Sequence, residues 1–168
     1  IQRKAAQGDV LIAASVAPAL KKMYPDCKII FSTMCPHVLE GNPYIDKTIT
    51  KEEDINDKSF DLYYNLDMAY EYRPNTNILK SYADSVGVDV KDCKLHLQTS
   101  IVNDLPESYI ALHAGNTNWA GRNWSKIKFD ILSAQLQKLG HKVICVGSNH
   151  DNQTTCDFVK KHTVQTFT

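Results

Sequence analysis

The segment that most constrains the fold is a short apolar run that opens into a polar, glycine-containing loop. Residues 109–112, YIAL, have the length and apolar character of a buried strand, and most of residues 113–125 are small or polar. Apolar residues then recur at helical spacing over 126–139. A strand, a loop and a helix in this order aim backbone N–H groups and the positive helix end at an anion. The stretch predicts either a phosphate site or a solvated connection in which Gly115 only makes a turn.

The same alternation of strands and helices extends over the rest of the chain. Strand-like runs occupy 27–33, 45–50, 59–66, 93–97, 141–147 and 163–167, and helical spacing occupies 10–24, 76–86 and 149–161. A stretch without either pattern, 99–108, contains Pro106 and has the character of a linker. We therefore predict an α/β protein with parallel sheets and helices on both faces, divided into domains 1–104 and 105–168.

The charge and the metal-binding residue types exclude several function classes. The 168 residues carry 19 basic and 19 acidic side chains, so there is no excess of basic residues. The charge therefore gives no indication of a nucleic acid or an anionic membrane as a partner. The five cysteines are scattered without a C-x-x-C pair, and the six histidines show no H-x-x-x-H spacing. No apolar stretch reaches the roughly 18 residues of a membrane span, and no signal peptide is visible. These patterns predict reduced thiols in the cytoplasm and no metal site.

The start of the first predicted helix carries Gly8 and Asp9. Asp9 has two interpretations: it caps the helix, for which aspartate is well suited, or it does chemistry there. Pro18 lies inside the same helical pattern, and we expect it to kink the axis.

Polar side chains also follow the strands of the second part. Arg122 is the only cation of residues 109–124, and it either contacts a diphosphate with its planar fork or pairs with a surface carboxylate. Asn149 follows a turn after a strand, and it either contacts a ribose or base or caps the next helix. Trp124 is either a packing anchor or a platform for a ligand. No G-x-G-x-x-G or G-x-x-x-x-G-K-[ST] motif supports a dinucleotide or P-loop site.

Two groups of segments together resemble one enzyme family. GDVLIAASVAPALKKMYPDCKIIF followed by GNPYIDKTI resembles the amino-terminal signature of glycosyltransferase family 9, which includes the heptosyltransferases of lipopolysaccharide synthesis. YIALHAGNTNWAGRNWSKIKF followed by LGHKVICVGSNHD is similar to the donor-binding unit of that family. The resemblance covers nearly the whole chain, and the two signatures occur in the family's order.

The resemblance implies a GT-B architecture of two Rossmann-like units, of which the second is only partly present in these residues. It implies inverting, metal-independent transfer of a heptose-like sugar without a cofactor. The donor would be a nucleoside-diphosphate sugar, and the acceptor a lipopolysaccharide or another cell-surface glycan or glycolipid. The reaction would take place in the cytoplasm, at the inner face of the membrane, with peripheral association through the acceptor.

The family's motifs also imply roles for single residues. Asp9 falls on the general base, beside an acceptor-side turn at Gly8, and we expect it to face Arg122 across one gap. Arg122 falls where the family usually has a lysine that binds the donor phosphates. The remaining donor positions implied by the match are Gly115, Asn116 and Thr117 around the diphosphate and Asn149 near the nucleoside. Two alternatives stay open, namely a non-catalytic module that binds sugar nucleotides or glycans and a nucleotide-sugar epimerase of the GT-B fold.

Overall fold

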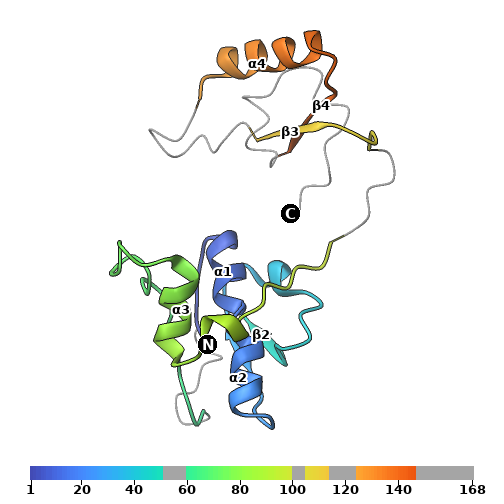
Figure 1. Cartoon of the computed structure of the whole chain (residues 1–168). Coiled ribbons are helices and arrows are strands. Elements are labelled where there is room, and N and C mark those ends of the chain that lie inside the picture. Colours follow the sequence, from blue (N-terminus) through green and yellow to red (C-terminus); the bar gives the residue numbers. More distant parts are fainter. Residues whose placement is uncertain (51–59, 100–104, 114–123, 147–168) are drawn as a thin grey trace. The chain divides into compact units, whose positions relative to one another are not determined.

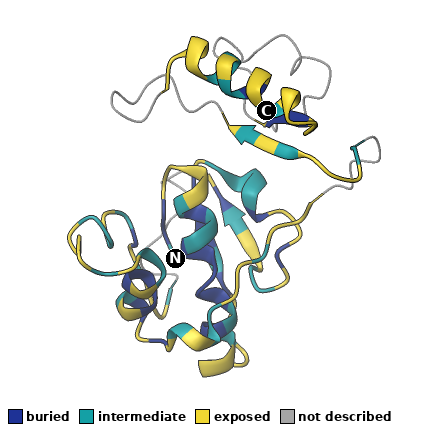
Figure 2. Cartoon of the chain, turned by 45° about the horizontal axis from the view of Figure 1, so that its top comes forward, coloured by how far each residue is buried: buried dark blue, intermediate teal, exposed yellow. Residues whose placement is uncertain are grey.

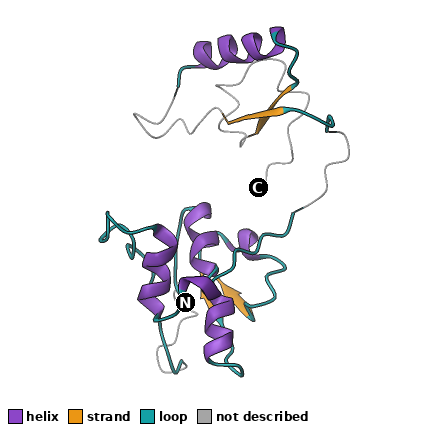
Figure 3. Ribbon diagram, viewed as in Figure 1, coloured by secondary structure: helices purple, strands orange, loops and turns teal. Residues whose placement is uncertain are grey.

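The computed structural model describes residues 1–50, 60–99, 105–113 and 124–146. The chain forms two compact units, Ile1–Thr99 and Ser100–Thr168 (Figure 1). In both units helices accompany strands that pair in parallel (Figure 3). The predicted α/β class with parallel sheets is therefore confirmed.

The sheet of the first unit is built around the beginning of the chain. Strand β1 (Ile30–Ser32) pairs in parallel with β2 (Lys47–Ile49), in the register that places Phe31 beside Thr48. Gln2 makes parallel bridges to Ser32 on one side and to Asn65 on the other. The first residues therefore lie between β1 and the segment at Asn65, a position that the sequence did not predict.

Pro18 does more than kink the predicted first helix. The structure has two helices, α1 (Gln7–Ala14) and α2 (Ala17–Met23), and Pro18 lies in the first turn of α2. Proline has no N–H to bond the carbonyl of the preceding turn, and its ring clashes with that carbonyl. The first turn of a helix has no preceding turn, so proline is tolerated there. The prediction of one continuous helix was wrong for this reason.

The third helix agrees with the helical pattern predicted at 76–86. Helix α3 (Ile78–Val86) begins after Asn77, whose side chain accepts from the backbone N–H of Leu79 at 2.9 Å. It ends at Gly87, which has the left-handed conformation with φ 75° that glycine adopts without strain. The described residues of this unit also include the 3₁₀ helices η1 (Pro36–Leu39) and η4 (Val90–Asp92).

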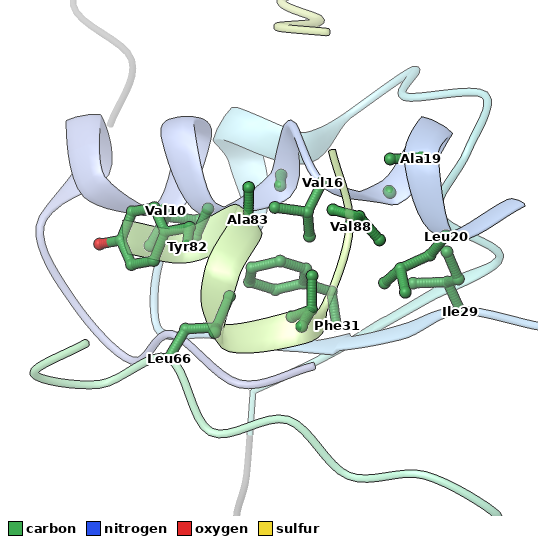
Figure 4. Close-up of a cluster of buried hydrophobic side chains, with 14 of the residues drawn as sticks. Val10, Val16, Ala19, Leu20, Ile29, Phe31, Leu66, Tyr82, Ala83 and Val88 are labelled. Carbon is green, nitrogen blue, oxygen red and sulfur yellow. The ribbon is translucent and has the colours of Figure 1, made fainter. Parts of the chain in front are cut away.

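The hydrophobic core of the first unit joins its helices to β1. Figure 4 shows Phe31 of β1 among buried side chains that include Ala83 of α3 and Val16, which lies between α1 and α2. Phe31, Leu66 and Tyr82 have no exposed surface. Burial of each such side chain stabilises the fold by about 1.5–3 kcal/mol. Figure 2 shows buried residues, in dark blue, on the helices and the strands of this unit.

The described part of the second unit confirms the strand and the helix predicted there, and the loop between them, residues 114–123, lies outside the described residues. Strand β3 (Ile110–His113) pairs in parallel with β4 (Val143–Val146), and helix α4 (Lys126–Lys138) lies between them in sequence. Trp124 packs edge-to-face on Phe129 at 5.5 Å between ring centroids, which makes it a packing residue. The predicted helix at 149–161 and the strand at 163–167 lie outside the described residues.

Of two further predicted strands, the one at 59–66 is reduced to a single parallel bridge with Gln2 in its described part, and the one at 93–97 is wrong. Among described residues 60–66 only Asn65 forms a bridge, and the side chains of Leu62 and Tyr63 are about half exposed. Residues 93–97 form no strand, although Leu95 and Leu97 alternate with polar residues, because this segment pairs with no strand and exposes both leucines. Within the described ranges, no helix combines the length and the apolar character needed to cross a bilayer.

Candidate functional site

The candidate site lies at the carboxyl ends of the strands of the first unit. Arg3 follows the bridge residue Gln2, Thr33 follows β1 and Asp67 follows shortly after Asn65. Asp67 accepts hydrogen bonds from Nε2 of Gln2 at 2.6 Å and from the backbone N–H of Lys4 at 2.7 Å. In sheets of parallel strands, ligands bind outside the carboxyl ends. These loops therefore occupy the edge at which such a fold binds its ligands.

Asp9 lies in the first turn of α1 and does not cap it. The helix begins at Gln7, the capping position belongs to Ala6, and no side chain caps the end. Instead, Oδ2 of Asp9 accepts from Nη2 of Arg3 at 2.5 Å and from the hydroxyl of Tyr70 at 3.1 Å. The capping interpretation of Asp9 was therefore wrong, and its carboxylate is held by residues of the sheet edge.

Arg3 is a buried cation between two carboxylates. Its Nη2 also donates to Oε1 of Glu71 at 3.0 Å, and its guanidinium lies 5.4 Å from the ring centroid of Tyr70. Only 6% of the residue is exposed. Burial lowers the pKa of Arg3, but the hydrogen bonds to Glu71 and Asp9 outweigh burial and raise the pKa above its usual value. The positive charge is therefore permanent.

We call five residues the Arg3 cluster: Arg3, Asp9, Tyr70, Glu71 and Tyr82. Its two carboxylates exceed its one cation by one negative charge. Burial is also the main cause that raises the pKa of the Tyr70 and Tyr82 hydroxyls, so both stay neutral at pH 7. Within the part that the structure describes, three buried polar atoms of the cluster have no hydrogen-bond partner: Nε of Arg3, Oε2 of Glu71 and Oη of Tyr82. Such unpaired buried groups are rare in native proteins, and each of them needs an explanation.

Backbone strain accompanies the cluster in both loops that carry it. Ala6, just before α1, has φ 66°, and Met68, just before Tyr70, has φ 62°. Residues with a Cβ seldom adopt positive φ, and such strain concentrates at functional sites.

Gly8, the predicted acceptor-side residue, lies in the first turn of α1, and a Cβ added there would meet no atom within 4 Å. The space beside Gly8 is open, and its role at the acceptor side stays a prediction.

The predicted donor residues Gly115, Asn116, Thr117, Arg122 and Asn149 lie outside the described residues. Their roles, and the facing of Asp9 and Arg122, stay predictions. The structure supports the frame of the donor loop at both ends, because β3 ends at His113 and α4 begins at Lys126. In the described ranges no three metal-binding side chains come together.

Sequence reasoning missed Arg3, Tyr70 and Glu71. Arg3 lies close to Asp9 in sequence, but only the central position of Gln2 in the sheet brings it to the same edge. Tyr70 and Glu71 lie more than sixty positions from Arg3, and the one available signal was their place shortly after the apolar run at 59–66.

Sequence comparison identifies no relative: no protein-family model matches the chain, and no curated protein matches it. Solved structures do match. A glycosyl transferase family 9 protein of Veillonella parvula superposes with a TM-score of 0.68 at 16% identity, over 90% of this chain and 63% of that one. The chain has the fold of these glycosyltransferases. The resemblance seen in the sequence is thus confirmed at the level of the fold.

Two heptosyltransferases share this fold. TibC of enterotoxigenic E. coli, a dodecameric iron-containing enzyme solved with ADP-D-β-D-heptose, matches with a TM-score of 0.60 at 16% identity, over 86% of this chain and 40% of its own. ADP-heptose lipopolysaccharide heptosyltransferase II of E. coli matches with a TM-score of 0.51 at 15% identity, over 91% and 66%. The chain therefore spans between 40% and 66% of the length of these glycosyltransferases.

Proposed function

We propose that the protein is a glycosyltransferase of the family 9 type. It moves a heptose-like sugar from a nucleoside-diphosphate sugar to a hydroxyl of a glycan or glycolipid acceptor. The observation that carries this proposal is the carboxylate of Asp9, which Arg3 and Tyr70 hold at the carboxyl end of a parallel sheet in the fold of these enzymes. Two carboxylates with one buried cation suit proton abstraction better than the binding of an anion at this edge.

In the proposed reaction Asp9 is the general base. It takes the proton of the acceptor hydroxyl while the acceptor oxygen forms a bond to the anomeric carbon of the donor sugar. The bond from that carbon to the diphosphate oxygen breaks, and its electron pair leaves with the nucleoside diphosphate. One displacement of this kind inverts the anomeric centre, and Asp9 afterwards releases the proton to solvent.

The leaving diphosphate needs compensation of its charge, and in this proposal no metal supplies it. Arg122 and the backbone N–H groups at Gly115, Asn116 and Thr117 provide the donors. Asn149 contacts the nucleoside. The end of β3 at His113 and the start of α4 at Lys126 support this role, because a helix start that follows a strand and a loop attracts anions.

The proposed donor class rests on the solved structures with the same fold. TibC contains ADP-D-β-D-heptose, and the E. coli enzyme is a lipopolysaccharide heptosyltransferase. We therefore propose ADP-heptose as the first donor to test and a lipopolysaccharide core or another cell-surface glycan as the acceptor. Transfer would take place in the cytoplasm, at the inner face of the membrane that carries the acceptor.

The substitution Asp9→Asn tests the base. It keeps the size of the side chain and removes its basicity, so we expect turnover to fall by roughly 10²–10⁴-fold with donor affinity retained. The measurement is ADP release from ADP-D-β-D-heptose with a heptose-truncated lipopolysaccharide core as acceptor, using full-length protein. Asp61→Asn, at an exposed carboxylate, is the matched control. Full turnover by the Asp9 variant would reject the base.

The substitution Arg122→Ala tests the donor side. Loss of a charged hydrogen-bond partner should weaken donor binding by about 1.5–3 kcal/mol. Calorimetry with ADP-D-β-D-heptose measures the change, and Arg73→Ala, at a cation that pairs with Asp84 on α3, is the control. An unchanged affinity would remove Arg122 from the donor site.

The same assays separate the alternatives. A protein that binds ADP-D-β-D-heptose but neither transfers nor hydrolyses it is a binding module. Isomerisation of the donor without an acceptor indicates an epimerase.

A further inference from the structure

We infer that Arg3 and Tyr70 are positioning residues, which hold one oxygen of Asp9 so that the other oxygen meets the acceptor hydroxyl. This inference rests on the proposed function, in which Asp9 is the base. It assigns roles to two residues that the sequence motifs do not single out.

The hydrogen bonds of Asp9 all fall on one oxygen. Nη2 of Arg3 and Oη of Tyr70 both donate to Oδ2, at 2.5 and 3.1 Å. Among the described residues, no hydrogen bond reaches Oδ1. A carboxylate has about four acceptor positions, and two of them on one oxygen are thus occupied by the protein. The other oxygen stays available to a hydroxyl, and 19% of the side chain is exposed, compared with 7% for Arg3.

Arg3 is fixed well enough to orient a neighbour. Its backbone N–H donates to the carbonyl of Ser32 at 3.1 Å, so its main chain belongs to the sheet. Its guanidinium also donates to Oε1 of Glu71 and to the carbonyl of Leu66. The rings of Tyr70 and Tyr82 lie 5.4 and 6.0 Å from it. The orientation of Asp9 is therefore set by the sheet edge and not only by its own helix.

Glu71 completes this arrangement without touching Asp9. It accepts from the same Nη2 atom of Arg3 that serves Asp9, and its second oxygen has no partner among the described residues. A planar guanidinium that bridges two carboxylates cannot turn toward one without losing the other. Asp9 is thus restrained in direction as well as in distance, which is what a base needs to stay within hydrogen-bond reach of the proton it takes.

A double-mutant cycle separates positioning from mere stabilisation. Arg3→Lys and Tyr70→Phe are made alone and in the Asp9→Asn background, and kcat, KM and melting temperature are measured with ADP-D-β-D-heptose and the truncated lipopolysaccharide core. We expect each single change to lower kcat, Arg3→Lys by roughly tenfold or more, with KM for both substrates changed less than about twofold. In the Asp9→Asn background neither change should lower the residual rate further, because both act through Asp9.

Matched controls come from the same loop. Tyr72→Phe and Arg73→Lys repeat the two changes at exposed positions outside the Arg3 cluster, and both should leave kcat unchanged. If Arg3→Lys does not fold, Tyr70→Phe still decides, because phenylalanine keeps the ring and its edge contact with Tyr82 at 5.9 Å.

Two results would overturn the inference. In the first, the folded Arg3→Lys and Tyr70→Phe variants keep the wild-type kcat. In the second, their losses of kcat multiply with the loss caused by Asp9→Asn. If Asp9→Asn loses turnover and either result is found, only the positioning role of Arg3 and Tyr70 is rejected. If Asp9→Asn keeps its turnover, the role of Asp9 as general base is rejected.

Discussion

At the scale of one residue, Tyr82 lowers the stability of the first unit close to the candidate base. Its ring is fully buried in the core, and Figure 4 shows its hydroxyl at one end of the buried cluster. That hydroxyl has no hydrogen-bond partner among the described residues. A buried hydroxyl without a partner lowers the free energy of unfolding, and here it does so beside Arg3.

The substitution Tyr82→Phe should therefore stabilise the protein. Removing an unpaired buried hydroxyl and keeping the ring should raise the free energy of unfolding at pH 7 by about 1 kcal/mol. Urea unfolding measures the change, and Tyr72→Phe, at a tyrosine that is 78% exposed, should have no effect. A loss of stability in the Tyr82 variant would mean that the hydroxyl is paired in solution.

The same residue predicts a loss of stability at alkaline pH. Burial raises the pKa of Tyr82 above its ordinary value of 10.0. Above pH 10 the unfolded chain loses this proton while the folded protein keeps it, so the contribution is complete below pH 10 and is lost as pH rises toward the folded-state pKa. The free energy of unfolding should thus fall between pH 10 and 11, and less steeply in Tyr82→Phe. Equal slopes in both proteins would contradict this.

At the scale of the element, helices with clear end signals were predictable. The spacing of apolar residues and Gly87 located α3, and the structure adds the capping side chain of Asn77. Asn77→Ala should lower the free energy of unfolding by about 1 kcal/mol, because two backbone N–H groups lose their acceptor. Urea unfolding with the exposed Asn75→Ala as control checks this, and equal effects of the two changes would argue against a cap.

Elements that depend on pairing were less predictable. An alternating pattern at 93–97 satisfies the strand criterion, but a strand also needs a partner, and that depends on distant parts of the chain. Gln2 shows the opposite case. It lies between two strand segments of the sheet, although no apolar run around it predicts a strand. Pro18 gave a correct signal for a disturbed helix, although its strength was underestimated.

The candidate site follows the same division. Asp9 could be singled out because its signal is local, a carboxylate at a helix start. Arg3, Tyr70 and Glu71 could not, because their meeting is a product of the sheet order and of two strained loops. The sequence therefore predicts the reacting group of the proposed reaction, and only the structure reveals the groups that orient it.

At the scale of the whole molecule, the first unit has the parts of an independent domain. All fifteen buried residues of its hydrophobic core come from residues 10–88. A fragment of residues 1–99 should thus unfold cooperatively in urea, since a core of this kind supports a domain of this length. Circular dichroism at 222 nm measures the transition. Phe31→Ala should lower its free energy of unfolding by about 3–5 kcal/mol, and a fragment without a transition would contradict the prediction.

The central place of Gln2 has a consequence for synthesis on the ribosome. Gln2, Arg3 and Asp9 leave the exit tunnel before Asn65, Tyr70 and Glu71, which follow more than fifty residues later. At about 5–20 residues per second, the nascent chain spends seconds with the middle of its sheet unpaired on one side. The carboxylate of Asp9 is therefore fully oriented only after Tyr70 and Glu71 have been made. A nascent chain that stalls or ends before them would carry Asp9 without its full set of partners.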